Sequence, residues 1–534
     1  MSTRQALARI AENRKTFDQL INEAQTAVGK TRYRVAAATL QSAARFAWFN
    51  HPGLFFSPEL DRVAARIGDH LPIIGSHLGE LRGHIVHVLS QAYSAGGHTR
   101  LVWRWIENDD KRVNSVVITG QQGVAIPQEL QDAVAATGGR IVILGENSSD
   151  LLVRAAELKR IVERGVDTVV LHVHPYDVIP SIALSDVSAH VIFLNHADHV
   201  FSTGVSISDL VADIRPAGRL LSIARRNVPI ERSTILPIPL TAPPARDSRT
   251  ARRELNISQD SVVILSIASE YKYAASEGDH FIDIHRQLVI DHPNVELIVI
   301  GPRPTGRWLE ASNESGGRFR AVGMVRDIDT YYASADVYVD SVPFASLTSL
   351  LDAAIRGVPV VALSETLSDS VLSSNDISLT DMGVHTSNRS EYIRRMRNLI
   401  SMPETRRQLG DDIRKRVLDD HSHPGWNREL ERILDSRKSD AVVNTIEGDQ
   451  LSERDVAALD HELVKFQDAS GLSGPLWTFR VRDAPFLPTV DRVRLLMTVP
   501  WARRLQSLTY VVPDVSRTIL KTRLARLATK LKRT

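Results

Sequence analysis

The residues most suited to chemistry lie in the segment 336–361, DVYVDSVPFASLTSLLDAAIRGVPVV. A short apolar strand leads into a loop, and a helix is predicted to begin near Leu347. Thr348 and Ser349 then fall in the first helical turn, where free backbone amides and the positive end of the helix dipole bind phosphate. Asp352 lies four residues beyond Thr348 on the same face, where a carboxylate can accept hydrogen bonds from two ribose hydroxyls. The segment predicts a nucleotide site; the alternative is that these residues only cap and begin a helix.

A lysine follows another predicted strand. The apolar run Val262–Ile267 leads through Ala268-Ser269-Glu270-Tyr271 to Lys272. Ligands of parallel sheets bind at the carboxyl ends of strands, so this lysine is placed for contact with a ligand. An ammonium group there can stabilise a departing diphosphate in place of a metal. The alternative is an ordinary surface lysine that is exposed to solvent and binds no ligand.

Both motifs resemble the donor-binding motifs of the protein O-GlcNAc transferase family, which has the GT-B fold. In that family a D-T-P stretch leads to H-T-T and then to an aspartate. Here the spacing from Asp340 to Asp352 is the same, Thr348-Ser349 stands in place of the threonine pair, and Leu347 replaces the histidine. The Tyr-Lys pair that ends at Lys272 also matches. The resemblance implies a UDP-type sugar donor, contact between Lys272 and the diphosphate, and no cofactor.

The resemblance also bears on stereochemistry. Many retaining GT-B enzymes carry two glutamates with seven residues between them. Phe344 and Asp352 occupy the corresponding positions, so the first carboxylate is missing. By resemblance this favours an inverting transfer.

A glycine pair follows the first predicted strand, Ile85–Leu89. Gly96 and Gly97 let the backbone approach a ligand closely, and His98 comes next. GT-B enzymes place such a loop over the reacting sugar, and the O-GlcNAc transferase family has a histidine nearby. We therefore predict donor contacts for the two glycines and a catalytic role for His98, although glycine pairs after strands are common.

Two groups of histidines follow later strands of the same half: His172 and His174, then His196, Asp198 and His199. A histidine beside a carboxylate can act as a general base or orient an acceptor hydroxyl. We predict that His196 is catalytic, as in many GT-B transferases, and that the other four line the acceptor side. The alternatives are a metal site, for which no third ligand presents itself, and ordinary polar residues at strand ends.

The triplet Asp327-Ile328-Asp329 has the D-x-D form of metal-dependent transferases. It precedes a predicted helix, and acidic residues are common in a first turn. We interpret it as a helix start and predict no metal site. By analogy with GT-B proteins, Val325, just before it, should lie near the nucleotide base.

The elements that position these residues follow an alternating pattern of buried strands and helices, which is typical of doubly wound α/β domains. The predicted strands are Ile85–Leu89, Ser115–Thr119, Arg140–Leu144, Thr168–Val173, His190–Leu194 and Arg219–Ile223, then Val262–Ile267, Glu296–Ile300, Phe319–Val322, Val337–Val339 and Val358–Leu363. Residues 241–253, rich in proline and arginine, predict a linker between the two sets. The fold predicted is GT-B: two Rossmann-like domains that face a cleft.

We predict four regions in all: an N-terminal helical region at 1–80, an acceptor-side domain at 81–245, a nucleotide-sugar domain at 246–436, and a C-terminal extension at 437–534. The alanine-rich run Ala36–Trp48 predicts a helix that His51-Pro52-Gly53 ends. The extension ends in a predicted amphipathic helix with leucines at 520, 524, 527 and 531 and basic residues at 517, 521, 523, 526, 530, 532 and 533. Such a helix either lies on an anionic membrane surface or packs on the protein.

Composition narrows the class of protein. The 534 residues include no cysteine, which excludes disulfides and zinc–thiolate sites, and the net charge of +2 gives no general attraction to nucleic acid. The N-terminus has no apolar run like that of a secretory signal, and no stretch approaches the roughly 20 apolar residues that span a bilayer. We expect a cytoplasmic protein, or one that rests on the inner face of a membrane.

Together these features predict a metal-independent glycosyltransferase. The acceptor would attack the donor's sugar directly while Lys272 and the helix amides stabilise the leaving diphosphate. The weak membrane signal favours a glycan or glycolipid acceptor in surface polysaccharide assembly. The alternatives are transfer to protein, a nucleotide-sugar epimerase of the same fold, and a catalytically silent scaffold.

Overall fold

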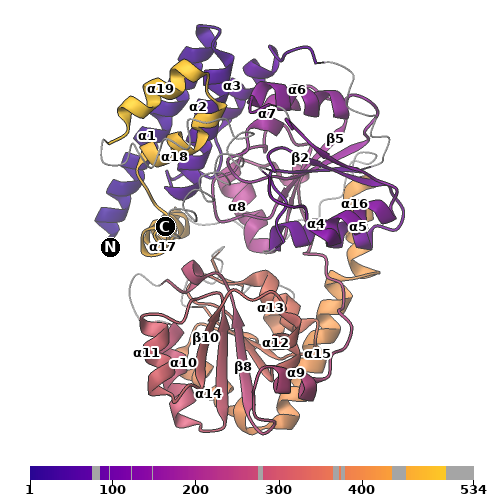
Figure 1. Ribbon diagram of the computed structural model, residues 1–534, viewed down its shortest axis with the longest axis vertical. Coiled ribbons are helices and arrows are strands. Elements are labelled where there is room, and N and C mark those ends of the chain that lie inside the picture. The colour runs from indigo at the N-terminus through magenta and orange to yellow at the C-terminus, as the bar shows by residue number, and fades with distance from the viewer. Residues whose placement is uncertain are drawn as a thin grey trace, which may run out of the picture.

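A computed structural model of the chain describes residues 1–534 except 75–84, 95–96, 122, 147, 275–280, 365–371, 375–378, 436–452 and 501–534. Two α/β lobes lie one above the other, and a group of helices from both ends of the sequence flanks the upper lobe (Figure 1). This architecture confirms the predicted fold class.

The first lobe is built on a parallel sheet with the order β3-β2-β1-β4-β5-β6-β7. Its strands are β1 (Ile85–Leu89), β2 (Asn114–Ile118), β3 (Ile141–Ile143), β4 (Thr168–His172), β5 (His190–Asn195), β6 (Leu210–Asp213) and β7 (Ser233–Ile235). Its helices are α4 (Gly97–Asn108), α5 (Gln128–Ala136), α6 (Leu151–Val162), α7 (Ile179–Ala183) and α8 (Pro216–Arg226), with the 3₁₀ turn η1 (Ile230–Arg232). The strand order reverses between β1 and β4, which is where open parallel sheets bind ligands.

The second lobe repeats this plan with the order β10-β9-β8-β11-β12-β13. The strands are β8 (Val262–Ile267), β9 (Val295–Ile300), β10 (Phe319–Gly323), β11 (Val337–Val339), β12 (Val360–Leu363) and β13 (His385–Thr386). The other elements are α9 (Ser248–Glu254), η2 (Glu270–Tyr273), α10 (Phe281–Asp291), α11 (Arg307–Glu314), α12 (Asp329–Ser334), α13 (Leu347–Ala354), η3 (Thr380–Met382) and α14 (Arg389–Ser401). Here the reversal lies between β8 and β11.

Two local predictions were wrong. Arg219–Ile223 belongs to α8 rather than to a strand. Pro216 begins that helix, and Ala217 and Leu221 bury one of its faces, a helical spacing that a five-residue apolar run conceals. The second half of the predicted linker is also helical, because Asp247 caps α9 by accepting a hydrogen bond from the Thr250 amide at 2.8 Å.

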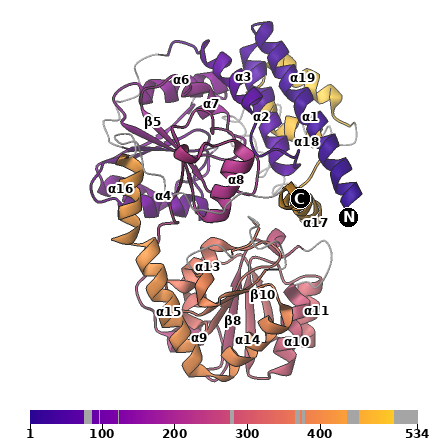
Figure 2. The ribbon, with the colours of Figure 1, turned by 180° about the vertical axis from the view of Figure 1, so that it is seen from behind.

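Helices from both ends of the sequence pack together beside the first lobe. The N-terminal region forms α1 (Thr3–Gly29), α2 (Tyr33–Phe49) and α3 (Pro58–Gly68), and the C-terminal extension adds α17 (Glu453–Ala469), α18 (Leu476–Asp483), η4 (Ala484–Phe486) and α19 (Thr489–Thr498). Phe479 of α18 meets Phe46 of α2 edge-on, with 5.9 Å between ring centroids. Figures 1 and 2 show α17 at the level where the two lobes meet.

The chain returns from the second lobe to the first along α15 (Pro403–His421) and α16 (Gly425–Asp435), seen on one side of the molecule in both ribbon views (Figures 1 and 2). Trp426 of α16 is fully buried. Its ring lies edge-on to Trp105 of α4, 5.6 Å between centroids, and its Nε1 donates to the Pro237 carbonyl at 2.7 Å. This tryptophan therefore joins the returning chain to the first lobe.

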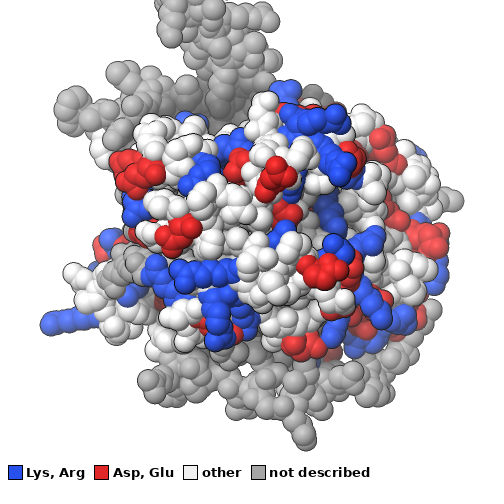
Figure 3. Space-filling model, turned by 90° about the horizontal axis from the view of Figure 1, so that it is seen from below, with Lys and Arg blue, Asp and Glu red and all other residues white. Residues whose placement is uncertain are grey.

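Among the described helices, none is long and apolar enough to cross a membrane. Seen from below, basic and acidic side chains are interspersed over the second lobe (Figure 3), as expected for a chain with a net charge of +2. The predicted basic helix near the C-terminus lies outside the described residues, so membrane contact through it stays a prediction.

We expect Trp426→Ala to lower the free energy of unfolding by about 3–5 kcal/mol, because it leaves a large cavity and an unpaired carbonyl where the lobes are joined. Urea denaturation followed by circular dichroism measures this loss. Leu309→Ala on α11, where the side chain is 46% exposed, serves as the control and should change stability by about 0.5 kcal/mol or less. Equal losses in the two variants would contradict the structural role given to Trp426.

Candidate functional site

Lys272 lies beside the start of α13, at the reversal point of the second sheet. It belongs to η2, directly after β8, and its Nζ donates to the Ala345 carbonyl at 2.9 Å and sits 4.7 Å from the centre of the Phe344 ring. Asp340, after β11, accepts hydrogen bonds from the amides of Ser341 and Ser346 at 2.8 Å each, which holds the loop that leads into α13. The predicted lysine and the predicted helix start are therefore neighbours.

Burial lowers the pKa of Lys272 to about 8, while Asp340 acts in the opposite direction. The ammonium is thus poorly solvated in the free protein. An anion placed beside it would restore its preference for the charged form.

The N-termini of two helices meet across the lobes. Gly97 is the first residue of α4, and a Cβ atom added there would lie 2.6 Å from Thr348 Oγ1 in the first turn of α13. A larger residue at 97 would force the Thr348 side chain to move. The donor contact predicted for Gly97 stays a prediction, and Gly96 lies outside the described residues. Each helix start carries free amides and a partial positive charge. The two positive ends therefore repel each other unless an anion lies between them.

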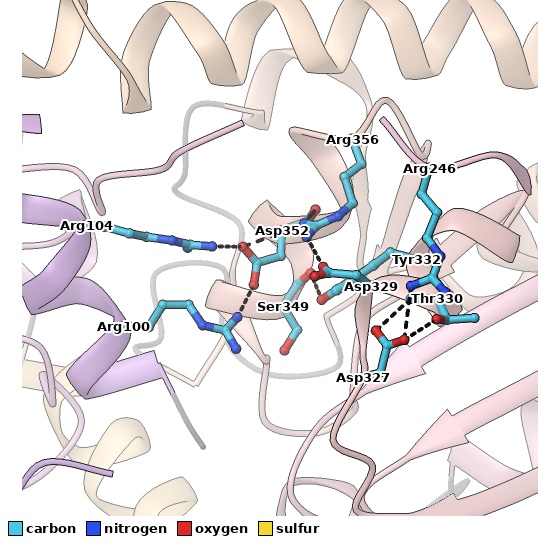
Figure 4. Close-up of polar contacts among 10 residues, drawn as sticks. All are labelled: Arg100, Arg104, Arg246, Asp327, Asp329, Thr330, Tyr332, Ser349, Asp352 and Arg356. Carbon is cyan, nitrogen blue, oxygen red and sulfur yellow. Dashed lines mark hydrogen bonds and ion pairs between the residues drawn. The ribbon is translucent and has the colours of Figure 1, made fainter. Parts of the chain in front are cut away.

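An interlobe ion pair fixes this arrangement (Figure 4). The Asp352 carboxylate, 2% exposed, accepts from Arg100 Nη1 at 2.5 Å and from Arg104 Nη2 at 2.7 Å, both on α4. The sequence analysis missed these arginines, although their spacing of four after the glycine pair places them on one helical face. The ribose contact predicted for Asp352 stays a prediction.

Histidines gather at the reversal point of the first sheet. The His98 ring lies 4.5 Å from that of His196 and 5.4 Å from that of His174, measured between centroids. His172 Nε2 and His87 Nδ1 are 2.9 Å apart in the strands below. Within the described residues no group of histidine, aspartate and glutamate side chains has the geometry of a metal site.

These imidazoles are neutral. Burial lowers the pKa of His98, His172 and His196, and their mutual repulsion lowers the last two further; the pKa of His174 falls to about 3. His98 Nε2 lies against the His172 carbonyl, which can only accept, so Nε2 carries the proton. Its buried Nδ1 has no partner among the described residues and therefore presents a free lone pair.

Asp198 and His199 lie beside Lys272, and His199 is also close enough to His196 to lower its pKa. The His199 ring meets Phe344 edge-on at 4.7 Å, and Asp198 accepts from Arg215 Nε at 2.7 Å. Burial raises the pKa of Asp198, but Arg215 and His199 together outweigh this and hold it below its usual range. Arg215 also donates to the Ser373 carbonyl of the second lobe. The acceptor-side role predicted for Asp198 and His199 stays a prediction.

The remaining predicted residues lie around α12 and α13 (Figure 4). The Ser349 hydroxyl accepts from Ser346 Oγ at 3.1 Å, and its carbonyl accepts from the Tyr332 hydroxyl at 2.9 Å. Val325 is partly buried against the core of the second lobe. Asp327 accepts from the Thr330 amide and hydroxyl and from Arg246, as expected of a residue that begins a helix.

Comparisons with known proteins bear on the fold and the family. Residues 262–401, which include Lys272 and Asp352, match the family described as Glycosyl transferases group 1. No curated protein matches the sequence.

Among solved structures, a glycosyltransferase from Rickettsia africae matches 67% of this chain and 99% of its own, at 13% identity and TM-score 0.53. Anabaena Alr3699/HepE in complex with UDP and glucose matches 66% of this chain and 100% of its own, at 14% identity and TM-score 0.52. An O-GlcNAc transferase from Thermobaculum terrenum matches 86% of this chain and 85% of its own, at 15% identity and TM-score 0.45. The predicted resemblance to GT-B glycosyltransferases is confirmed.

Arg104→Met should lower the free energy of unfolding by about 1.5–3 kcal/mol, because it removes a charge-assisted hydrogen bond from the buried Asp352 carboxylate. Arg407→Met is the matched control, since Arg407 pairs with Glu404 but is 68% exposed; we expect a loss of about 1 kcal/mol or less. Thermal and urea unfolding of the two variants give the comparison. A loss no larger in Arg104→Met than in Arg407→Met would show that the interlobe ion pair contributes little.

Proposed function

We propose that this protein is a glycosyltransferase that moves a sugar from a nucleoside diphosphate, with UDP as the nucleotide, to an acceptor hydroxyl. The observation that carries the proposal is the meeting of the α4 and α13 N-termini at Gly97 and Thr348, with Lys272 beside the second of them. Three positive groups converge there, and a diphosphate is the anion that would satisfy them together. The family match over residues 262–401 supports the same activity.

In the proposed reaction, the acceptor oxygen attacks the anomeric carbon of the donor sugar. The bond from that carbon to the diphosphate oxygen breaks, and the diphosphate leaves with both electrons. Lys272 and the amides of the two helix starts stabilise the negative charge that develops on it. This displacement would invert the anomeric centre.

The acceptor proton needs a base, and His98 is the best candidate. Its Nδ1 lone pair is free, and its lowered pKa keeps the ring neutral until it takes the proton. His196, whose ring stands 4.5 Å away, would orient the acceptor hydroxyl. His199, which meets Phe344 beside Lys272, would contact the diphosphate or the transferred sugar, and Asp198 would hold His199 and Arg215 in place.

UDP is proposed because a protein of the same fold, Anabaena Alr3699/HepE, is solved with UDP and glucose. We further propose a hexose or N-acetylhexosamine as the sugar and a glycan or glycolipid of surface polysaccharide assembly as the acceptor. Peripheral attachment to a membrane would come from residues 515–534. Transfer to protein remains the rival within this activity, and a silent scaffold or an epimerase would be a different class.

A ligand screen tests the proposal directly. A donor present at about 100 times its dissociation constant should stabilise the purified protein by about 2.7 kcal/mol, seen as a rise in melting temperature. UDP-glucose, UDP-N-acetylglucosamine, their GDP counterparts and free UDP form the panel. Stabilisation followed by release of UDP indicates an enzyme; a new nucleotide sugar without acceptor indicates an epimerase, and stabilisation without turnover indicates a scaffold.

The affinity for UDP should fall as the pH rises above 8. The lysine must be protonated to bind the diphosphate, so each pH unit above its pKa of about 8 costs close to tenfold in affinity, until the pKa of the bound state is reached. Isothermal titration between pH 7 and 9.5 measures this dependence.

Lys272→Met is the variant that links the pH effect to this side chain. It should bind UDP weakly at pH 7 and show a flat pH profile, whereas Lys415→Met on the exposed surface of α15 should behave like the unaltered protein. A Lys272→Met variant that binds UDP with the original affinity and the original pH slope would refute the proposed contact.

His98→Ala should slow transfer by about 10²–10⁴-fold while UDP affinity stays close to that of the unaltered protein, because the base acts on the acceptor and not on the diphosphate. The rate of UDP release with acceptor present and a binding titration separate the two effects. His70→Ala on the exposed end of α3 is the control. A loss of UDP binding equal to the loss of rate would show instead that His98 supports the donor site.

A further inference from the structure

Four partly exposed rings line up next to His98, and we name them the aromatic shelf: Trp48, Tyr93, His174 and Tyr176. Trp48 stacks on Tyr176 with 5.5 Å between centroids, and Tyr93 stacks on His174 at 5.9 Å. His174 lies 5.4 Å from Tyr176 and joins the two pairs. Each of the four residues keeps part of its surface accessible.

The shelf is assembled from three separate parts of the chain. Trp48 comes from the last turn of α2, Tyr93 from the loop after β1, and the other two from the loop after β4. His174 is in ring contact with His98 at 5.4 Å. The shelf therefore extends from the proposed base toward the N-terminal helices, on the first-lobe side, while Lys272 and α13 belong to the second lobe.

Helices from the C-terminal extension hold the shelf in place. The Arg45 guanidinium lies 3.5 Å from the centre of the Tyr176 ring and donates to Asp483 of α18 at 2.8 Å. Gln467 of α17 donates to the Trp48 carbonyl at 3.0 Å. A surface fixed in this way loses little entropy when a ligand binds to it.

The chemistry of the shelf fits a sugar ring. The C–H faces of a pyranose are apolar and flat enough to pack on aromatic rings, while its hydroxyls need partners at the edges. The Tyr176 hydroxyl pairs with His174 Nδ1 at 3.1 Å and the Tyr93 hydroxyl donates to Gln91, so each tyrosine oxygen still has a lone pair that can accept from a sugar hydroxyl. A lipid tail would gain nothing from these polar groups.

We propose that the aromatic shelf binds a sugar ring of a carbohydrate acceptor and delivers its hydroxyl to His98. This assignment rests on the proposed transferase function and adds to it the residues that would hold a carbohydrate acceptor. It also gives the N-terminal helical region a role in recognition through Trp48.

Saturation-transfer NMR tests the shelf without knowledge of the natural acceptor. The probes are cellobiose, N,N′-diacetylchitobiose and methyl β-D-glucopyranoside, each added to the full-length protein with saturating UDP. We expect transfer to the ring C–H protons of at least one probe. Trp48→Ala and Tyr93→Ala, on different elements, should each weaken that binding at least several-fold and leave the affinity for UDP unchanged.

Tyr33→Ala is the matched control, because Tyr33 begins the same helix as Trp48 and stacks on His70 at 4.4 Å, away from the shelf. It should bind the probes as the unaltered protein does. The proposal is overturned if UDP binds but no probe does, or if both shelf variants retain full probe binding. Failure of UDP itself to bind would instead count against the proposed function.

Discussion

The site depends on positive groups that the fold brings together and that an interlobe ion pair holds in place. Two helix N-termini, of α4 and α13, are brought together at Gly97 and Thr348, and the poorly solvated ammonium of Lys272 lies beside the second of them. Such a concentration of positive potential would drive the lobes apart if nothing opposed it. Asp352 opposes it by binding Arg100 and Arg104 across the same boundary. The folded lobes are thus held in a geometry that favours the binding of an anionic ligand between them.

The two lobes contribute different groups to the site. The second lobe contributes charge and amides, and its sequence matches a family over residues 262–401. The first lobe contributes the amides at the start of α4 and neutral imidazoles, kept neutral by burial and by one another. In the proposed reaction, Lys272 and the helix starts would stabilise the negative charge, and the imidazoles would accept the proton.

Much of this could be predicted from the sequence, and the failures have physical causes. Lys272 and the start of α13 were found because each follows a buried strand, where local pattern determines position. The arginine partners of Asp352 were missed because a contact between residues about 250 positions apart leaves no local signal. The strand predicted at Arg219–Ile223 failed because short apolar runs suit both secondary structures.

The contact between Arg45 and Asp483 joins residues 438 positions apart. During synthesis, α2 leaves the ribosome long before α18 exists, and domains form in order as the chain emerges. The second lobe is therefore complete while the aromatic shelf of the first lobe still lacks the Asp483 contact that holds Arg45. A polypeptide that stops before α18 would carry the shelf without this support.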